Sequence, residues 1–197
     1  MLDITASLYQ QPLALDYAVD AVERIYTPLT YGGGVRSFSD FSAIIRSVGE
    51  KACLCTQALT TPTLITQAAH RYGSQAVVVE GQVRGGQAFY HAGREPSGRD
   101  ALEWCCEAVD RGAGELLIKA VDRDGTGAGY DLEFLGKLAP RVAVPIVASG
   151  GGGTPAHCVE AIEAGASAVA VATILHAGTT IGAIKQHMAA AGLEVRA

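Results

Sequence analysis

Three features of the sequence predict an α/β barrel of parallel strands. Short apolar runs alternate with helical stretches along the chain, an order typical of parallel strands joined by right-handed crossovers. The units are short and uniform, and polar residues and glycines follow the ends of the apolar runs, where barrel active sites lie. The chain also repeats internally as two halves. An open nucleotide-binding sheet is disfavoured, because no GxGxxG turn is followed by an acidic residue about twenty positions later.

Each expected strand is an apolar run bounded by turn residues, and each expected helix repeats apolar residues every three or four positions. Strands are expected at 1–6 (the tail of a strand), 28–31, 51–55, 75–79, 115–121, 144–148 and 167–172. Helices are expected at 12–26, 38–48, 61–72, 99–112, 131–139, 154–164 and 179–191. Gly112 and Pro140 end two of these helices. Residues 82–98 place two glycines between short alternating segments, a pattern that indicates a hairpin.

These elements are one unit short of a complete barrel. Seven strands are expected, whereas a complete barrel has eight strand–helix units in about 250 residues. We therefore expect a single domain over residues 1–197, a barrel that lacks its first strand–helix unit. Its unpaired edges would be the strands at 1–6 and 167–172. Because exposed edges are normally paired or covered, we expect these two strands either to pair with each other or to drive self-association.

A glycine signature occurs twice, each time with a threonine twenty-two positions later. In the first copy, at residues 32–34, Gly34 is followed by Thr56. In the second, at residues 150–153, Gly151 is followed by Thr173. Glycine turns at helix starts bind phosphate through backbone N–H groups, since no side chain blocks the approach. Two such turns facing each other predict a ligand with a phosphate at each end.

Composition narrows the functional class. The net charge is −5, and the sequence has no basic run or aromatic–basic interleaving of the kind that nucleic-acid surfaces show. No apolar run reaches membrane-spanning length, and the N-terminus does not have the pattern of a secretion signal. The five cysteines and five histidines lack the spacing of a zinc site, so no metal or cofactor is expected. Reduced thiols in a cytoplasmic protein are the simplest interpretation.

Seven segments together resemble the cyclase subunit of imidazole glycerol phosphate synthase. They are residues 2–7 (LDITAS), 31–36 (YGGGVR), 73–79 (GSQAVVV), 111–115 (RGAGE), 122–126 (DRDGT), 129–131 (GYD) and 148–151 (ASGG). The resemblance spans nearly the whole chain, and the DRDGT–GYD element is its most specific part. A similar branch of the family serves sugar amidation in surface-polysaccharide synthesis, and a tyrosine before the glycines, as at Tyr31, is commoner there.

The resemblance implies a (βα)8 TIM barrel of histidine biosynthesis, a lyase without a cofactor. Such a subunit receives ammonia from a glutaminase partner. It converts a bisphosphorylated ribulosyl substrate into imidazole glycerol phosphate and an aminoimidazole carboxamide ribotide (AICAR).

The resemblance also implies roles for individual residues. One phosphate would bind at Gly33, Gly34 and Thr56, and the other at Gly125, Gly150, Gly151, Ala172 and Thr173. Asp3, Asp124 and Thr126 would lie at the mouth of the pocket, with Asp3 and Asp124 supporting catalysis, and Cys55, Lys119 and Ser149 would line it. Lys51 and Glu115 match charged residues at the ammonia entrance, on the opposite barrel face.

The sequence departs from the family at its catalytic positions. One catalytic aspartate belongs to the first strand, which is absent from this sequence, and the position of the other is Gln82. An amide does not titrate, so Gln82 cannot act as a general acid or base. Glu80 projects the same way as Gln82 but one layer deeper. An enzyme with impaired catalysis, a silent phosphate-binding scaffold for a glutaminase, and the amidation branch all stay open.

Overall fold

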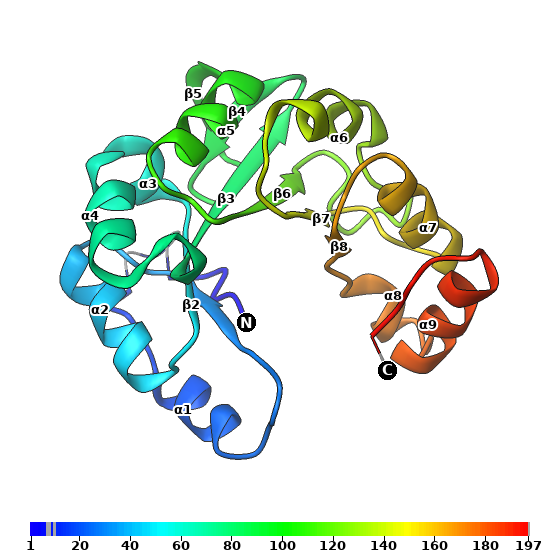
Figure 1. Cartoon of the computed structure of the whole chain (residues 1–197), viewed down its shortest axis with the longest axis horizontal. Helices are drawn as coiled ribbons and strands as arrows, with labels where there is room; N and C mark the ends of the chain where they lie inside the picture. Colours follow the sequence, from blue (N-terminus) through cyan, green and yellow to red (C-terminus); the bar gives the residue numbers. More distant parts are fainter. Residues whose placement is uncertain (7–8, 10, 197) are drawn as a thin grey trace.

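The computed structural model describes residues 1–6, 9 and 11–196. Strands β1 (Thr30–Gly32), β2 (Lys51–Leu54), β3 (Val77–Arg84), β6 (Glu115–Ala120), β7 (Ile146–Ser149) and β8 (Ala168–Val169) lie side by side in that order, and each neighbouring pair is parallel. The sheet curves, and most helices lie along its outer side (Figure 1). This arrangement is that of a partial (βα)8 barrel and confirms the predicted fold class.

The helices follow the strands in the expected alternation. They are α1 (Asp16–Val22), α2 (Phe38–Ser47), α3 (Thr56–Thr60), α4 (Thr63–Tyr72), α5 (Ala101–Asp110), α6 (Leu132–Leu138), α7 (Pro155–Glu163), α8 (Thr173–His176) and α9 (Ile181–Ala190). Two 3₁₀ turns, at Ser74–Ala76 and Ala139–Arg141, complete the described elements. The boundaries follow local capping. Ser37, for example, begins α2 in a reciprocal capping box with Asp40.

The two ends of the sheet differ most from the sequence prediction. The expected strand at 1–6 reduces to a single bridge between Leu2 and Gly32, because the Asp3 carboxylate accepts hydrogen bonds from the N–H groups of Thr5 and Ala6 and turns the chain away. The expected strand at 167–172 keeps two residues, Ala168 and Val169, which are the two that pair in register with β7. The expected helix at 12–26 forms over Asp16–Val22 only.

The segment at 82–98 forms a hairpin, as predicted, and the hairpin grows directly out of β3. Strand β4 (Gln87–Tyr90) pairs antiparallel with β3, and β5 (Glu95–Asp100) pairs antiparallel with β4. Strand β3 is therefore eight residues long rather than the expected five. Its extension beyond Val79 carries Glu80 and Gln82.

Two apolar clusters lie on opposite sides of the sheet. The larger one packs the inner faces of the helices against the sheet and includes Phe41, Trp104 and Leu135. The smaller one consists of Cys53, Val78 and Leu117 with Val147, from four neighbouring strands. Because residues two apart on a strand face the same side, this smaller cluster forms an apolar layer inside the curve of the sheet.

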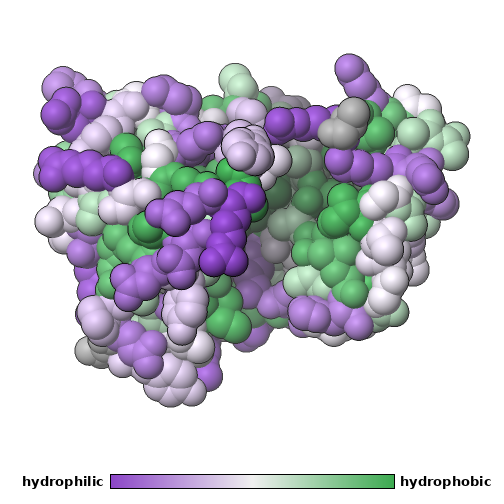
Figure 2. Space-filling model, turned by 90° about the horizontal axis from the view of Figure 1, so that it is seen from below, coloured by the Kyte–Doolittle hydropathy of each residue, from purple (hydrophilic) through white to green (hydrophobic). Residues whose placement is uncertain are grey.

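The curve does not close among the described residues. Strand β8 pairs with β7 alone, and the bridge at Leu2 joins β1 at the far end of the sheet. The expectation that residues 1–6 pair with residues 167–172 is therefore wrong for the part of the chain that the structure describes. Seen from below, the molecule has a hollow between its two ends, with apolar atoms on its walls (Figure 2).

Candidate functional site

Two connected cavities open at the carboxyl ends of the strands, where the sequence places its polar residues. The inner one has a volume of about 90 Å³ and the wider one about 600 Å³. Both are lined by Leu2, Ile4, Ala92, Lys119 and Ser149, so they form one continuous site.

The second glycine signature lies on the wall of the wider cavity, together with Ala172, Thr173 and Asp124. Gly150 and Gly151 have φ of +83° and +105°, a conformation that favours glycine. A Cβ atom on Gly151 would lie 2.1 Å from the carbonyl oxygen of Gly129. The turn therefore needs glycine here, and its backbone faces a cavity large enough for a ligand.

Two residues predicted for this region do not line either cavity in the described structure. The Thr126 hydroxyl donates to the carbonyl oxygen of Arg123 at 2.6 Å and accepts from the Ala128 N–H at 3.1 Å. Both hydrogen bonds stabilise the turn that contains Thr126. Gly125 has no atom within 4 Å of the position where a Cβ would lie, and it is exposed in the same turn. The expected place of Thr126 at the mouth of the pocket therefore stays a prediction.

The first glycine signature is less accessible to a ligand than the second. Gly33 lines the inner cavity, whereas Gly34 faces Ala6, Gln11 and Leu13, the nearest atom being 3.1 Å from a Cβ built on it. Thr56 begins α3, and its hydroxyl accepts a hydrogen bond from the His91 N–H at 3.2 Å. The predicted trio of Gly33, Gly34 and Thr56 therefore does not share one cavity.

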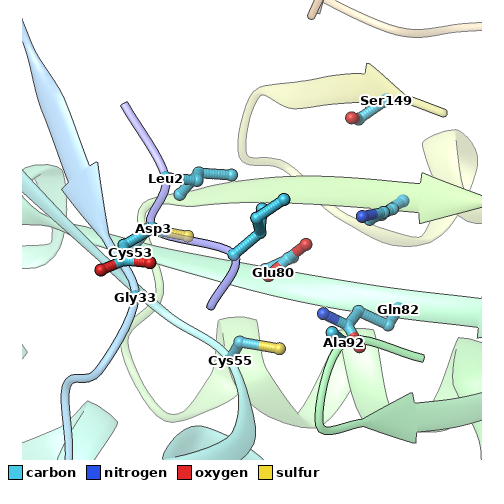
Figure 3. Close-up of a pocket in the computed structure, with 11 residues that line it drawn as sticks. Leu2, Asp3, Gly33, Cys53, Cys55, Glu80, Gln82, Ala92 and Ser149 are labelled. Atoms are coloured by element: carbon cyan, nitrogen blue, oxygen red, sulfur yellow. The ribbon is translucent and has the colours of Figure 1, made fainter. Parts of the chain in front are cut away.

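The inner cavity brings together side chains from three neighbouring strands. Glu80 and Gln82 project from β3, Cys55 follows β2, and Lys119 comes from β6. The labelled side chains of Cys55, Glu80 and Gln82 point into the same space (Figure 3). Lys119 Nζ lies 2.8 Å from Asp124 Oδ2. This ion pair links the inner cavity to the wider one.

Burial controls the charges in this cavity. It raises the pKa of Glu80, and the nearby Lys119 ammonium opposes that shift. Burial, reinforced by the negative charge of Glu80, raises the pKa of the Cys55 thiol well above its usual value. Cys55 is therefore a neutral thiol and a poor nucleophile, because the thiolate is the reactive form.

Gln82 has a structural partner. Its Oε1 accepts a hydrogen bond from the Gly93 N–H at 2.6 Å, and its side chain is 5 % exposed. Gly93 follows Ala92 in the loop between β4 and β5, so Gln82 fixes that loop over the cavity. Asp3 lines the inner cavity as well, and its hydrogen bonds from Thr5 and Ala6 lower its pKa, so it is a carboxylate.

No sequence pattern pointed to Leu2, Ile4 and Ala92 as residues of the site. Leu2 and Ile4 are apolar residues of the first segment, and Ala92 reaches the site only because the hairpin folds back over it. No local pattern reports such contacts.

Among the described residues, no group of three or more histidine, cysteine or acidic side chains could hold a metal ion. None of the described helices is long and apolar enough to cross a bilayer.

Lys51 and Glu115 form an ion pair at the opposite ends of the strands, with Nζ 2.5 Å from Oε2. The apolar layer of Cys53, Val78, Leu117 and Val147 lies between this pair and the inner cavity, since Lys51, Cys53 and Cys55 alternate along β2. The interior is thus charged at one end, apolar in the middle and polar at the other.

Comparison with known proteins agrees with this geometry. The family described as "Histidine biosynthesis protein" matches residues 1–180. The chain is similar to proteins named "Imidazole glycerol phosphate synthase subunit HisF" from Gluconacetobacter diazotrophicus and Kineococcus radiotolerans, at 44 % and 41 % identity. A third, from Beutenbergia cavernae, is 40 % identical. Each comparison covers 99 % of this chain and 78–80 % of the relative.

Proposed function

This chain belongs to the histidine biosynthesis protein family, and we propose that it acts as a cyclase subunit of imidazole glycerol phosphate synthase. In this proposal its cavity binds a bisphosphorylated ribulosyl substrate and combines it with ammonia. The products are imidazole glycerol phosphate and AICAR, and the protein works in the cytoplasm without a cofactor.

One observation carries the proposal. The glycine turn at Gly150 and Gly151 faces a cavity of about 600 Å³, together with Ala172 and Thr173. Backbone N–H groups in such a turn suit a phosphate, because they donate hydrogen bonds without a side chain in the way. Gly33 in the inner cavity and the adjacent Gly34 and Thr56 are proposed for the second phosphate, which would require the contacts of Ala6, Gln11 and Leu13 with Gly34 to open.

The opposite end of the barrel is proposed to receive the ammonia. The ion pair of Lys51 and Glu115 and the apolar layer above it support a route for a small neutral molecule from that end. A glutaminase subunit docked there would supply ammonia directly to the interior. This assignment separates the partner's face from the substrate's face.

Catalysis is proposed to be slow. General acid–base catalysis contributes roughly 10²–10⁴-fold, and Gln82 cannot provide it. The hydrogen bond from Gly93 to Gln82 favours the second candidate, a scaffold that binds phosphorylated ligands and a glutaminase without turnover. Tyr31, which suggested the sugar-amidation branch, donates its hydroxyl to the carbonyl oxygen of Ala14, a structural role that adds no support to that branch.

Calorimetric titration and a turnover assay with an ammonium salt test the proposal. We expect the bisphosphorylated substrate to bind, and turnover to lie far below that of relatives with both aspartates. We expect Gln82→Asp to raise turnover, with Glu133→Gln on the exposed face of α6 as a control that leaves it unchanged. Binding without turnover in both the wild type and Gln82→Asp would favour the scaffold, and absence of binding would overturn both.

A further inference from the structure

Glu80 lies at the boundary between the apolar layer and the cavity. Along β3, the inward positions are Val78, Glu80 and Gln82. Val78 belongs to the apolar layer, and Gln82 is held by Gly93. Glu80 pairs in register with Leu117 of the same apolar layer. Its carboxyl is therefore the first polar group of β3 above that layer, and it faces the inner cavity.

The charges around Glu80 leave its carboxyl able to exchange a proton. The ionisable groups that act on it are Lys119, Asp124 and Cys55. The Lys119 ammonium is paired with Asp124 at 2.8 Å, so its positive charge is shared between two carboxyl groups. Burial outweighs this attraction and raises the pKa of Glu80. An acid–base group is most effective when its pKa approaches the working pH.

Three other residues of the cavity, Cys55, Lys119 and Asp3, are less suited to this role. Cys55 keeps its proton because burial raises its pKa well above the usual value. Lys119 is engaged by Asp124, and an ammonium has no lone pair with which to accept a proton. Asp3 is committed to three hydrogen bonds from Thr5 and Ala6.

We propose that Glu80 is the catalytic acid–base residue of this site and replaces part of the contribution of the carboxylate that position 82 lacks; this rests on the proposed function. When the nitrogen of ammonia bonds to a carbonyl carbon of the substrate, the π electrons of that carbonyl move to its oxygen. The Glu80 carboxylate takes a proton from the new nitrogen and delivers it to the oxygen. After one further such transfer the oxygen leaves as water, a C=N bond remains, and Glu80 is again a carboxylate.

The test compares wild type, Glu80→Gln, Glu80→Asp and the surface control Glu133→Gln, each with the bisphosphorylated substrate and an ammonium salt across a pH series. Rates are expressed per concentration of unprotonated ammonia, so that the titration of ammonia itself does not enter. Glu80→Gln keeps the size of the side chain and removes the carboxyl. We expect it to lower kcat by about 10²–10⁴-fold while the substrate Kd changes little, and Glu80→Asp to retain part of the rate.

The pH profile supplies a second readout that needs no variant. Wild-type kcat should fall as the pH falls through the folded-state pKa of Glu80, because the carboxylate that accepts the proton is lost. A pH-independent kcat, or a kcat unchanged in Glu80→Gln, overturns the role of Glu80 and leaves the proposed function standing. Substrate binding without any wild-type turnover also overturns it, whereas absence of substrate binding overturns the proposed function itself.

Discussion

Lys51 Nζ lies 2.5 Å from Glu115 Oε2, although the strands that carry them, β2 and β6, are separated in the sheet by β3. The pair therefore reaches across the inside of the curve at the amino ends of the strands. Its side chains are 32 % and 17 % exposed, so the ions are partly removed from water. The sequence predicted both residues for this face and could not show that they touch.

Removing Lys51 should destabilise the fold more than removing an exposed cation. In Lys51→Ala, Glu115 would remain half-buried without its partner, at a cost of about 1–3 kcal/mol in the free energy of unfolding. The matched control is Lys137→Ala, whose pair with Glu133 is on the surface, where ion pairs contribute little to stability. Urea unfolding measures both, and equal losses would show that the Lys51 pair has no special role.

Gly151→Ala should weaken phosphate binding. A Cβ there would lie 2.1 Å from the Gly129 carbonyl oxygen, and the φ of +105° disfavours alanine, so the turn must shift. We expect the affinity for the bisphosphate to fall at least about tenfold, or 1.4 kcal/mol. Gly136→Ala is the control, since nothing lies within 4 Å of its Cβ position in α6 and alanine favours the helix by about 1 kcal/mol. Calorimetric titration of both variants decides, and unchanged binding in Gly151→Ala would remove this turn from the site.

The raised pKa of Glu80 predicts the sign of a stability change with pH. Between the unfolded-state pKa of glutamate and the raised folded-state value, the native protein holds more protons than the unfolded chain. The contribution of Glu80 to stability therefore falls as pH rises through this window and is constant above it. Glu80→Gln should gain stability relative to wild type at the upper end of the window. Chemical unfolding across the window checks this, and a constant difference would contradict it.

Asp3 should behave in the opposite way. Hydrogen bonds from Thr5 and Ala6 lower its pKa, so its contribution is present above the unfolded-state value and is lost as pH falls through the folded-state value. Asp3→Asn, measured in the same pH series, should therefore lose stability relative to wild type at the upper end of its window, the opposite of Glu80→Gln.

Much of the sheet could be predicted because its pattern is local. The strand at 51–55 and the helix at 38–48 match β2 and α2 within one residue, since apolar spacing and the cap at Ser37 specify them. The strand at 167–172 could not be placed as well, because only its first residues have a partner, in β7. Likewise, Ala92 reaches the site through the fold of the hairpin. Contacts between distant segments leave no local pattern.

The open edge of β8 predicts self-association of the 197-residue chain. In the part of the chain that the structure describes, strand β8 pairs with β7 alone, and an apolar groove of about 340 Å³ lies between β8 and α9, lined by Val169, Ile184 and Met188. Unpaired strand edges pair readily with another chain, and a charge on the edge opposes this. We expect oligomers by sedimentation velocity, fewer of them in Ala168→Lys, and no change in Ala189→Lys on exposed α9. A wild-type monomer whose 167–172 amides exchange freely would contradict this.

In the proposed function, the cavity at the carboxyl ends of the strands holds a phosphorylated substrate. A crystal structure of the chain with the bisphosphorylated ribulosyl substrate tests it most directly. We predict density for one phosphate against the backbone of Gly150 and Gly151 beside Thr173, with the rest of the molecule extending past Lys119 toward Glu80. A substrate bound elsewhere, or a cavity that stays empty at saturating concentration, would contradict the account.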